Sequence, residues 1–430
     1  MDPALILLAV VASVIGSLAG MFTGLVPGIH VNTLASVMLM AYPALVPAIS
    51  DRVDPAWTPM LVAVLIVSAS VVHSFVDFVP SVFTGAPDPD EVLSVLPGHR
   101  LLMEGRGMAA VRSAAVGSIV GAFSALILAI PLQYLMLAGL AERLDLLTFT
   151  VLSFTVAVMV IQAQGHRLLA VALMLLSGAL GFISMHGNIP CAGMLGDGTL
   201  LFPILAGLFG MPALLTSVGN AEVPRQRDDD IDPVGAVPGI KGVVMGCIAG
   251  WYPGITSAAG ASLASAVSPE EEPTRFISMT ASIGTVTAVF SVVTLSVTGS
   301  GRSGTVLVIR DIIGESAKGF CSEAFLLMLI GIAVGAALGY AMTIYAGKVL
   351  SRMSGGRDAS LLNKAVIALV TVLVLLLTGP FGLVFLSVAT LIGLIPLAAG
   401  CERIPLAGCL ILPVLLTEMS LTGTLLAAIL

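Results

Sequence analysis

Polar side chains follow a Pro-Gly pair at the end of an apolar run near the start of the chain. His30, Asn32 and Thr33 come directly after Pro27, Gly28 and one isoleucine. Proline lacks an amide hydrogen and glycine lacks steric restraint, so we expect a helix to break at this pair. The freed backbone groups and these side chains offer donors to an anion and oxygens to a cation. The residues therefore indicate a binding site for a charged solute.

The same arrangement occurs again in the second half of the chain. Gly20, Gly24, Pro27, Gly28 and Ile29 spell GxxxGxxPGI. The second copy consists of Gly246, Gly250, Pro253, Gly254 and Ile255, and it is followed by Thr256 and Ser257. The repetition indicates an internal duplication. Broken helices at matching positions of two halves are typical of a transport site, because unwound backbone needs partners that lipid does not supply.

Two ionisable residues lie in another apolar segment. His73 and Asp77 are four residues apart and share a face if the segment is helical. At membrane depth such groups are costly unless they face a cavity or a partner, which makes them candidates for binding a coupling ion. A pair that satisfies itself at a helix end near the membrane surface is an equally weighted alternative. Proton coupling would use His30, His73 or Asp77, and sodium coupling would use freed carbonyls with Asn32, Thr33 and Thr256.

A glycine-rich segment supplies the remaining candidates. It consists of Gly299, Ser300, Gly301, Arg302, Ser303 and Gly304. Its amides and hydroxyls can form a concave nest for an anion, and the guanidinium of Arg302 can grip a carboxylate or phosphate in two places. Arg302 and Ser303 are therefore predicted to contact the substrate. In the alternative interpretation, Arg302 ends a membrane span and extends to the lipid headgroups.

The composition places the chain in a membrane. Hydrophobic residues make up 57% of the 430 residues and charged residues only 10%, with a mean hydropathy of +1.08. This leaves too few polar residues to cover a soluble globule of this size. The apolar runs predict an all-α polytopic membrane protein of about 11 to 13 helices, some shorter than the roughly 20 residues that span a bilayer. The first run is interpreted as a retained helix rather than a signal peptide.

One hydrophilic segment divides the sequence. Residues 220–238 contain Arg225, Arg227 and an acidic run, and we interpret them as a solvated linker. The linker separates a first transmembrane repeat, residues 1–219, from a second, residues 239–430. We expect the repeats to be inverted in the membrane, so that the two breaks meet near its midplane.

Basic residues form two clusters that bear on the orientation. The clusters are Arg100, Arg106 and Arg112, and Lys348, Arg352, Arg357 and Lys364. Basic loops favour the cytoplasmic side. If each apolar run crosses the membrane, about seven crossings separate the clusters and place them on opposite faces. The sequence therefore leaves the orientation open.

Motifs for other chemistries are missing from the sequence. The five cysteines include no CxxC pair, and the five histidines include no HExxH spacing. No metal site, disulfide framework or cofactor is therefore expected, apart from a coupling Na+ or H+. The expected partners are a small organic anion and membrane lipids. The net charge of −7 says little about partners of a chain whose surface mostly faces lipid, and nucleic acid is not expected as a partner.

The repeated PGI blocks and the stretch APDPDEVLSVLPGHRLLMEGRG resemble the large membrane subunit of the tripartite tricarboxylate transporter family, in the form of its archaeal-type permease relatives. The resemblance covers nearly the whole chain. It implies a permease of two related halves that imports carboxylates such as citrate, together with a small membrane subunit and a soluble binding protein. It also implies that the Pro27 and Pro253 breaks form the site. The chain differs from the bacterial pattern between His73 and Ser81, where those permeases tend to have a Gly-Gly-Ser stretch.

The sequence thus predicts a secondary-active permease, not an enzyme, that moves a di- or tricarboxylate across the cytoplasmic membrane by alternating access. A translocase for a polyprenyl phosphate lipid carrier is an alternative, because a phosphate would also bind helix amides and Arg302. An intramembrane serine hydrolase is a weaker alternative. Gly301 to Gly304 match the GxSG of rhomboid-type proteases, but all five histidines precede Ser303, whereas such enzymes need a histidine on a later helix.

Overall fold

The computed structural model describes most of the chain. The described residues are 2–26, 30–51, 53–84, 95–163, 165–187, 189–193, 196–197, 200–217, 223–227, 234–301, 303–354, 359–401 and 403–421. Three predicted site residues, Pro27, Gly28 and Arg302, lie outside this part.

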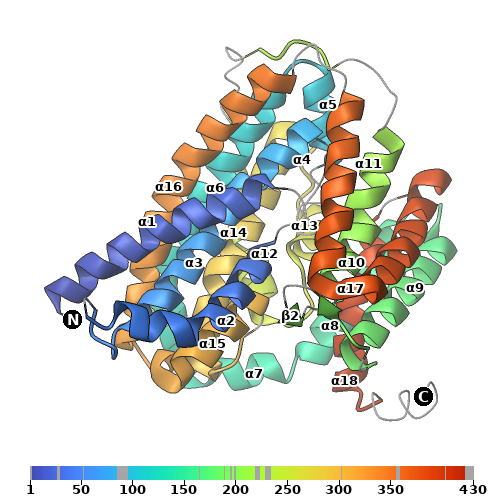
Figure 1. The fold of residues 1–430 in the computed structure, drawn as a ribbon. Coiled ribbons are helices and arrows are strands. Elements are labelled where there is room, and N and C mark those ends of the chain that lie inside the picture. The colour runs from blue at the N-terminus through green and yellow to red at the C-terminus, as the bar shows by residue number, and fades with distance from the viewer. Residues whose placement is uncertain are drawn as a thin grey trace.

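The described residues are mostly helical, as predicted (Figure 1). The helices before the linker are α1 (Pro3–Leu25), α2 (Val31–Ile49), α3 (Thr58–Val76), α4 (Phe78–Thr84), α5 (Val95–Met103), α6 (Gly107–Leu135), α7 (Ala141–Asp145), α8 (Thr148–Gln162), α9 (Arg167–His186), α10 (Leu201–Leu205) and α11 (Met211–Ser217). Those after it are α12 (Val237–Trp251), α13 (Ser257–Val267), α14 (Pro273–Thr298), α15 (Gly304–Ile313), α16 (Glu323–Ser354), α17 (Ala359–Ala399) and α18 (Gly408–Glu418).

A few shorter elements connect these helices. π-Helical segments extend α6 and join α10 to α11, and 3-10 turns follow α15 and precede α18; they span Met136–Leu140, Ala206–Gly210, Gly314–Ala317 and Ile404–Ala407. The two-residue strands β1 (Ala192–Gly193) and β2 (Gly196–Asp197) pair antiparallel.

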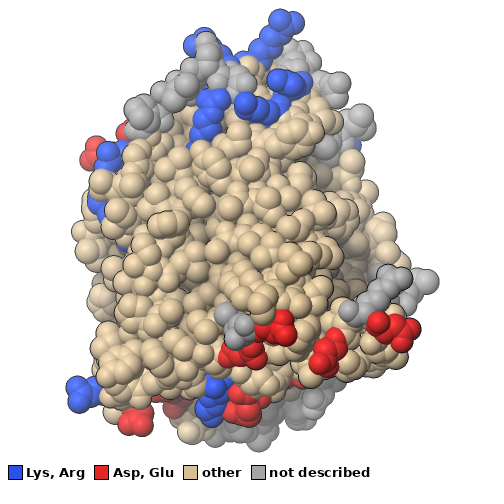
Figure 2. All heavy atoms as spheres, turned by 90° about the vertical axis from the view of Figure 1, so that its left-hand side faces the viewer, with Lys and Arg blue, Asp and Glu red and all other residues tan. Residues whose placement is uncertain are grey.

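Eight helices in the described part are long and apolar enough to cross a membrane. Five shorter apolar helices accompany them, α12 and α13 among them. Figure 2 shows a broad face of the molecule on which charged residues are gathered toward the two ends. The prediction of an all-α polytopic membrane protein is confirmed.

The long helices form two groups that lie side by side (Figure 1). One group contains α1, α3, α6, α12, α14 and α16, and the other contains α8 to α11, α17 and α18. Both predicted helix breaks belong to the first group, because they follow α1 and α12 directly.

Helix α1 packs on α3 through its glycines. A Cβ atom added to Gly20 would lie 2.3 Å from the carbonyl oxygen of Ala69, and one on Gly24 would lie 3.2 Å from that of His73. Side chains at these positions would collide with backbone, so glycine is what permits the close approach. The contact positions advance in the same direction along both helices, so α1 and α3 run parallel. The segment between them, which includes α2, must therefore lead back to the face from which α1 starts.

Helix α12 packs on α14 in the same register. A Cβ on Gly246 would lie 3.0 Å from the carbonyl oxygen of Ile283, and one on Gly250 would lie 3.1 Å from that of Thr287. The same number of residues separates each of these two glycines from its counterpart in α1. The contacted residues on α14 are likewise separated from those on α3 by a constant number of residues, which is a different number. The repeated glycines therefore make equivalent contacts in the two halves, and α13 leads back toward the start of α14.

Each of the two helix pairs, α1 with α3 and α12 with α14, packs on a third helix that comes from the other half of the sequence. A Cβ on Gly117 of α6 would lie 1.9 Å from the carbonyl oxygen of Ser278 on α14. At the equivalent position, a Cβ on Gly331 of α16 would lie 3.2 Å from the carbonyl oxygen of Val64 on α3. The number of residues from Gly117 to Gly331 equals the number from Val64 to Ser278. It also equals the number that separates the contact residues on α3 from their counterparts on α14. We call α1, α3 and α16 the first cassette, and α12, α14 and α6 the second cassette.

The two cassettes run in opposite directions. The start of α6 lies beside the end of α16, because a Cβ on Gly347 would lie 2.7 Å from the Val111 side chain. The end of α6 lies beside the start of α16, where the carboxamide of Gln133 donates to the Gly319 carbonyl (3.1 Å) and accepts from the Cys321 amide (3.0 Å). Since each cassette is internally parallel, the antiparallel contact of α6 with α16 inverts one cassette relative to the other.

Residues of both basic clusters lie at one end of the molecule. The end of α16, which carries Lys348 and Arg352, adjoins the start of α6, which carries Arg106 and Arg112. Seven simple crossings would place the clusters on opposite faces, but α13 leads back after α12, so this hairpin does not add a simple crossing between them. We call this end the basic face; Lys and Arg gather at one end of the molecule in Figure 2.

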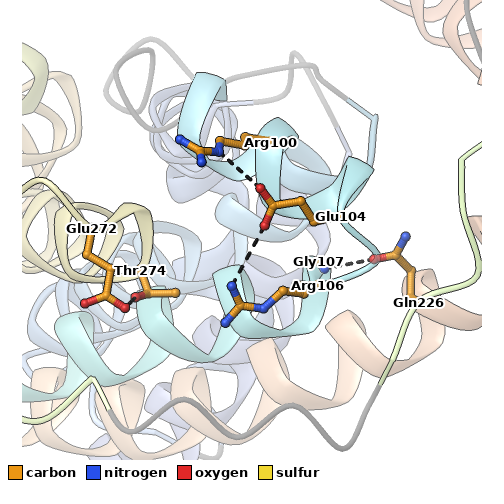
Figure 3. Close-up of polar contacts among 7 residues, drawn as sticks. All are labelled: Arg100, Glu104, Arg106, Gly107, Gln226, Glu272 and Thr274. Atoms are coloured by element: carbon orange, nitrogen blue, oxygen red, sulfur yellow. Dashed lines mark hydrogen bonds and ion pairs between the residues drawn. The ribbon is translucent and has the colours of Figure 1, made fainter.

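The described part of the linker is bound to the basic face rather than simply solvated. The Gln226 carboxamide accepts from the Gly107 amide (2.8 Å) and donates to the Leu102 carbonyl (3.0 Å). The Arg227 amide donates to the Gly105 carbonyl (2.8 Å). Figure 3 shows this contact beside the Arg100, Glu104 and Arg106 ion pairs and the start of α14. The linker therefore fixes the second half to the turn between α5 and α6.

Candidate functional site

The first helix break lies between α1 and α2. Helix α1 ends at Leu25, and His30 occupies the N-cap of α2, where its Nδ1 accepts from the Asn32 amide (3.1 Å). The Thr33 amide donates to the His30 carbonyl (2.9 Å). The polar residues after Pro-Gly thus form the first turn of a restarted helix, and its remaining amides point into the break.

Three titratable side chains gather at this break. The rings of His30 and His73 meet edge to face, with centroids 5.0 Å apart. His73 is 4% exposed and its Nδ1 lies 3.0 Å from the Thr23 hydroxyl of α1. Asp77 is 5% exposed and follows α3 directly, with its amide donating to the His73 carbonyl (3.0 Å). The structure therefore brings both coupling-ion candidates beside the first break.

The second helix break lies between α12 and α13. Helix α12 ends at Trp251, Gly254 has a φ of +82°, and Thr256 caps α13 by accepting from the Ala259 amide (3.1 Å). Pro253 precedes this left-handed glycine, and the Ser257 side chain is buried. A Cβ on Gly254 would lie 3.2 Å from a carbonyl oxygen of α18, so the turn packs closely on the second group of helices.

Both breaks lie near the crossing of α3 with α14. Ser74, next to His73, shares a hydrogen bond of 3.4 Å with Thr285 of α14. A Cβ on the adjacent Gly284 would lie 3.8 Å from the Ser257 hydroxyl of the second break. The starts of the two restarted helices therefore both lie beside this crossing.

The glycine-rich segment also reaches the first break. The Asn32 carboxamide accepts from the Thr305 amide in the first turn of α15 (2.9 Å), and a Cβ on Gly304 would lie 2.8 Å from Asn32. Ser303 caps α15, accepting from the Val306 amide (3.4 Å) and lying 3.1 Å from the Thr305 hydroxyl. Two helix starts from different halves, those of α2 and α15, therefore meet at Asn32.

No sequence motif indicates several residues that join the elements of this region. Thr23, Ser74 and Thr285 carry the hydrogen bonds that join the elements, but they read as isolated hydroxyls in apolar helices. Their signal is weak, because serine and threonine in membrane helices usually bond to their own backbone. The described residues contain no group of three or more His, Cys, Asp and Glu side chains that could hold a metal ion.

An ion-pair cluster closes the second hairpin, α12 and α13, at the basic face. Glu270, in the turn before α14, accepts hydrogen bonds from Lys241 of α12 and from Arg275 of α14 (2.9 Å). Its side chain is 6% exposed. Burial alone would raise the pKa of this carboxyl, but the two cationic donors outweigh it and lower the pKa.

We expect Glu270→Gln to lower the stability at pH 7 by about 1 to 3 kcal/mol, because two charge-assisted hydrogen bonds weaken. A carboxyl with a lowered pKa stabilises the fold above its unfolded pKa of about 4.3, and this contribution is lost as the pH falls through the folded value. The difference in melting temperature between wild type and variant should therefore shrink below about pH 4. Glu142→Gln, at an exposed site on α7, is the control. An equal difference at pH 3.5 and pH 7 would contradict the assignment.

Comparison with known proteins bears on what this architecture does. A family model described as the tripartite tricarboxylate transporter TctA family matches residues 10–408. The chain belongs to this family. The match confirms the resemblance of the PGI and LPGHRL blocks, and membership of the TctA family makes the chain a multi-pass membrane protein of a transporter family. A transporter family agrees with the expectation that the chain is not an enzyme.

Other comparisons with the TctA-family chain are sparse. An uncharacterized protein of Methanocaldococcus jannaschii is 25% identical over 289 residues, which cover 66% of this chain and 68% of that protein. No solved structure matches the chain. The geometry of the breaks therefore carries the argument about the site.

Proposed function

We propose that the protein is a secondary-active permease that carries a di- or tricarboxylate across the cytoplasmic membrane by alternating access. The observation that carries this proposal is the inversion of the two cassettes, which brings the helix breaks after α1 and α12 to the same crossing of α3 and α14 from opposite faces. Breaks that meet in this way offer one site to both sides of the membrane in turn.

The anion would bind at restarted helices. The starts of α2 and α13 present amides and a positive dipole end, which favour negative charge. Hydroxyl and carboxamide groups surround these amides, so a carboxylate can exchange its hydration shell for fixed donors. The described residues assigned to the substrate are His30, Asn32, Thr33, Pro253, Gly254, Thr256, Ser257 and Ser303, and the sequence prediction also assigns Pro27, Gly28 and Arg302.

The charge distribution supports an orientation. Arg106, Arg112, Lys348 and Arg352 lie at the basic face, and short basic loops favour the cytoplasmic side. We therefore place the basic face in the cytoplasm. In this orientation α1 enters from outside and α12 enters from inside.

Family membership also suggests partners. Permeases of tripartite transporters work with a small membrane subunit and a soluble binding protein, and the proposal extends both to this chain. In the proposed orientation the binding protein would approach the face at which α1 and α3 begin.

A ligand screen on the purified protein tests the function. Citrate, succinate, undecaprenyl phosphate and sodium chloride are added separately, and the melting temperature is measured. A carboxylate at 100 times its dissociation constant should stabilise the protein by about 2.7 kcal/mol. The same acid should then be taken up by proteoliposomes. Stabilisation by the lipid phosphate alone would replace the carboxylate permease with a lipid-carrier translocase.

A further inference from the structure

The two inverted cassettes match at their glycine contacts, but the side chains at equivalent positions near the breaks differ in chemistry. The glycine contacts pair Ala69 with Ile283. They also pair His73 with Thr287, because Gly24 contacts the His73 carbonyl and Gly250 contacts the Thr287 carbonyl. The same offset in the sequence pairs Asp77 with Ser291.

The restarted helices differ in the same way. The offset between the two PGI blocks pairs His30 at the N-cap of α2 with Thr256 at the N-cap of α13. Each of the three titratable groups at the first break thus has a hydroxyl at its counterpart. Thr287 donates to the Ile283 carbonyl (2.7 Å) and Ser291 to the Thr287 carbonyl (2.7 Å), so both hydroxyls serve the backbone of α14.

We propose that the pair His73 and Asp77, with His30, is the proton-binding site that couples transport, and that the second break contributes to anion binding without taking up a proton. The inference rests on the proposed function and assigns its coupling ion. It is inferred from the position of three groups that can exchange a proton. All three lie at one break, although equivalent helices precede and flank both breaks.

The hydrogen bonds identify the atom of His73 that takes the proton. The Thr23 hydroxyl lies 3.1 Å from the Gly20 carbonyl and 3.0 Å from His73 Nδ1. We assign its hydrogen to the carbonyl, so that the hydroxyl accepts from His73 and Nδ1 carries a hydrogen. The second nitrogen, Nε2, therefore receives the coupling proton. Asp77 lies one turn away and, as a carboxylate, stabilises the resulting imidazolium.

His30 connects this proton to the shape of the break. Its Nδ1 accepts the Asn32 amide, which requires a lone pair on that atom. An imidazolium has two donors and no acceptor, and its positive charge opposes the dipole at the start of α2. A proton on His30 would therefore release the cap of α2, so proton occupancy changes the first break and leaves the second unchanged.

The helices packed against α3 carry their charged residues near their ends. Their described parts contain no titratable residue in α1 and α4, and in the others Tyr42 of α2, Arg112 and Tyr134 of α6, Arg275 of α14, Arg310 and Asp311 of α15, and Glu323, Tyr340, Tyr345, Lys348 and Arg352 of α16. The charged residues among these lie within two turns of a helix end, and Tyr340 and Tyr345 are exposed. Arg106, which caps α6, lies at the basic face.

The test uses the full chain in proteoliposomes and citrate, or succinate if that acid stabilises the protein. Two rates are measured: accumulation driven by a pH gradient, and exchange of labelled for unlabelled acid without a gradient. In wild type, an inside-alkaline gradient should drive accumulation without sodium. In His73→Gln, and separately in Asp77→Asn, the ratio of accumulation to exchange should fall at least tenfold. His166→Gln, at an exposed position before α9, should keep the wild-type ratio.

The outcomes separate this inference from the function on which it rests. A wild-type protein that exchanges no carboxylate would contradict the permease itself. Exchange with accumulation driven only by a sodium gradient would overturn the proton site and leave the permease intact. The wild-type comparison holds even if a variant fails to fold. A ratio unchanged in both folded variants would also overturn the assignment.

Discussion

Gly117→Ala is expected to destabilise the protein by more than about 3 kcal/mol, because its Cβ would lie 1.9 Å from the Ser278 carbonyl oxygen. The neighbour is backbone inside α14, which cannot rotate away as a side chain would. Helices α6 and α14 would have to separate, and close packing at small residues is what holds helices together in lipid. The melting temperature in detergent and the yield of folded protein measure the effect.

Two further glycine variants control this prediction. A Cβ on Gly210, in a helical segment before α11, meets nothing within 4 Å, so Gly210→Ala should change the stability by less than about 1 kcal/mol. Gly331→Ala probes the equivalent contact in the first cassette, where the nearest atom is a Val64 side-chain carbon at 3.1 Å. Its effect should fall between the other two. Equal stability of Gly117→Ala and Gly210→Ala would refute the tight contact of α6 with α14.

The glycine repeat shows how far the sequence leads. GxxxG predicts close helix packing, and the second copy predicts equivalent packing in the other half. Neither identifies the partner helices, because the glycine of α6 contacts α14, which lies beyond the linker in the other half of the chain. The exchange of α6 and α16 between halves depends on such distant contacts, and no local pattern encodes it. The boundaries of the repeats at residues 219 and 239 remain a prediction.

The helix count shows a second limit. Helix α2 is apolar enough to cross a membrane, but Pro43 and Pro47 predict an interruption of it, whereas both prolines lie within the helix. Similarly, Gly379 and Pro380 predict two separate helices, whereas α17 continues through them with a kink at Gly379. Proline marks a change in backbone bonding, and tertiary packing decides whether the helix ends there or bends.

Composition and position predict the two helix breaks, but not the contacts that the residues after them make. Pro-Gly locates both breaks, and the polar residues after them become N-caps because His30 and Thr256 accept from the next turn. The meeting of Asn32 with the start of α15 joins residues 273 positions apart. A single sequence carries no sign of that contact, and it is the contact that makes Asn32 the residue to test.

Asn32→Asp is expected to weaken carboxylate binding about a hundredfold while leaving the fold intact. The new side chain still accepts from the Thr305 amide, and a negative charge at the start of α15 is favourable. The same charge about 5 Å from a bound carboxylate would oppose it by about 3 kcal/mol at an effective dielectric constant near 20. Ligand-induced stabilisation and initial uptake rates measure the loss.

Controls separate a binding role from a capping role. Asn32→Ala removes the acceptor and should cost about 1 kcal/mol of stability, because the Thr305 amide loses its partner. Ser50→Asp places the same charge at the exposed end of α2, about 27 Å away along the helix, and should leave binding unchanged. If Asn32 only caps α15, Asn32→Asp will bind carboxylate as wild type does. A selective loss in Asn32→Asp requires instead that a negatively charged solute come within a few ångströms of the place where the two helix starts meet.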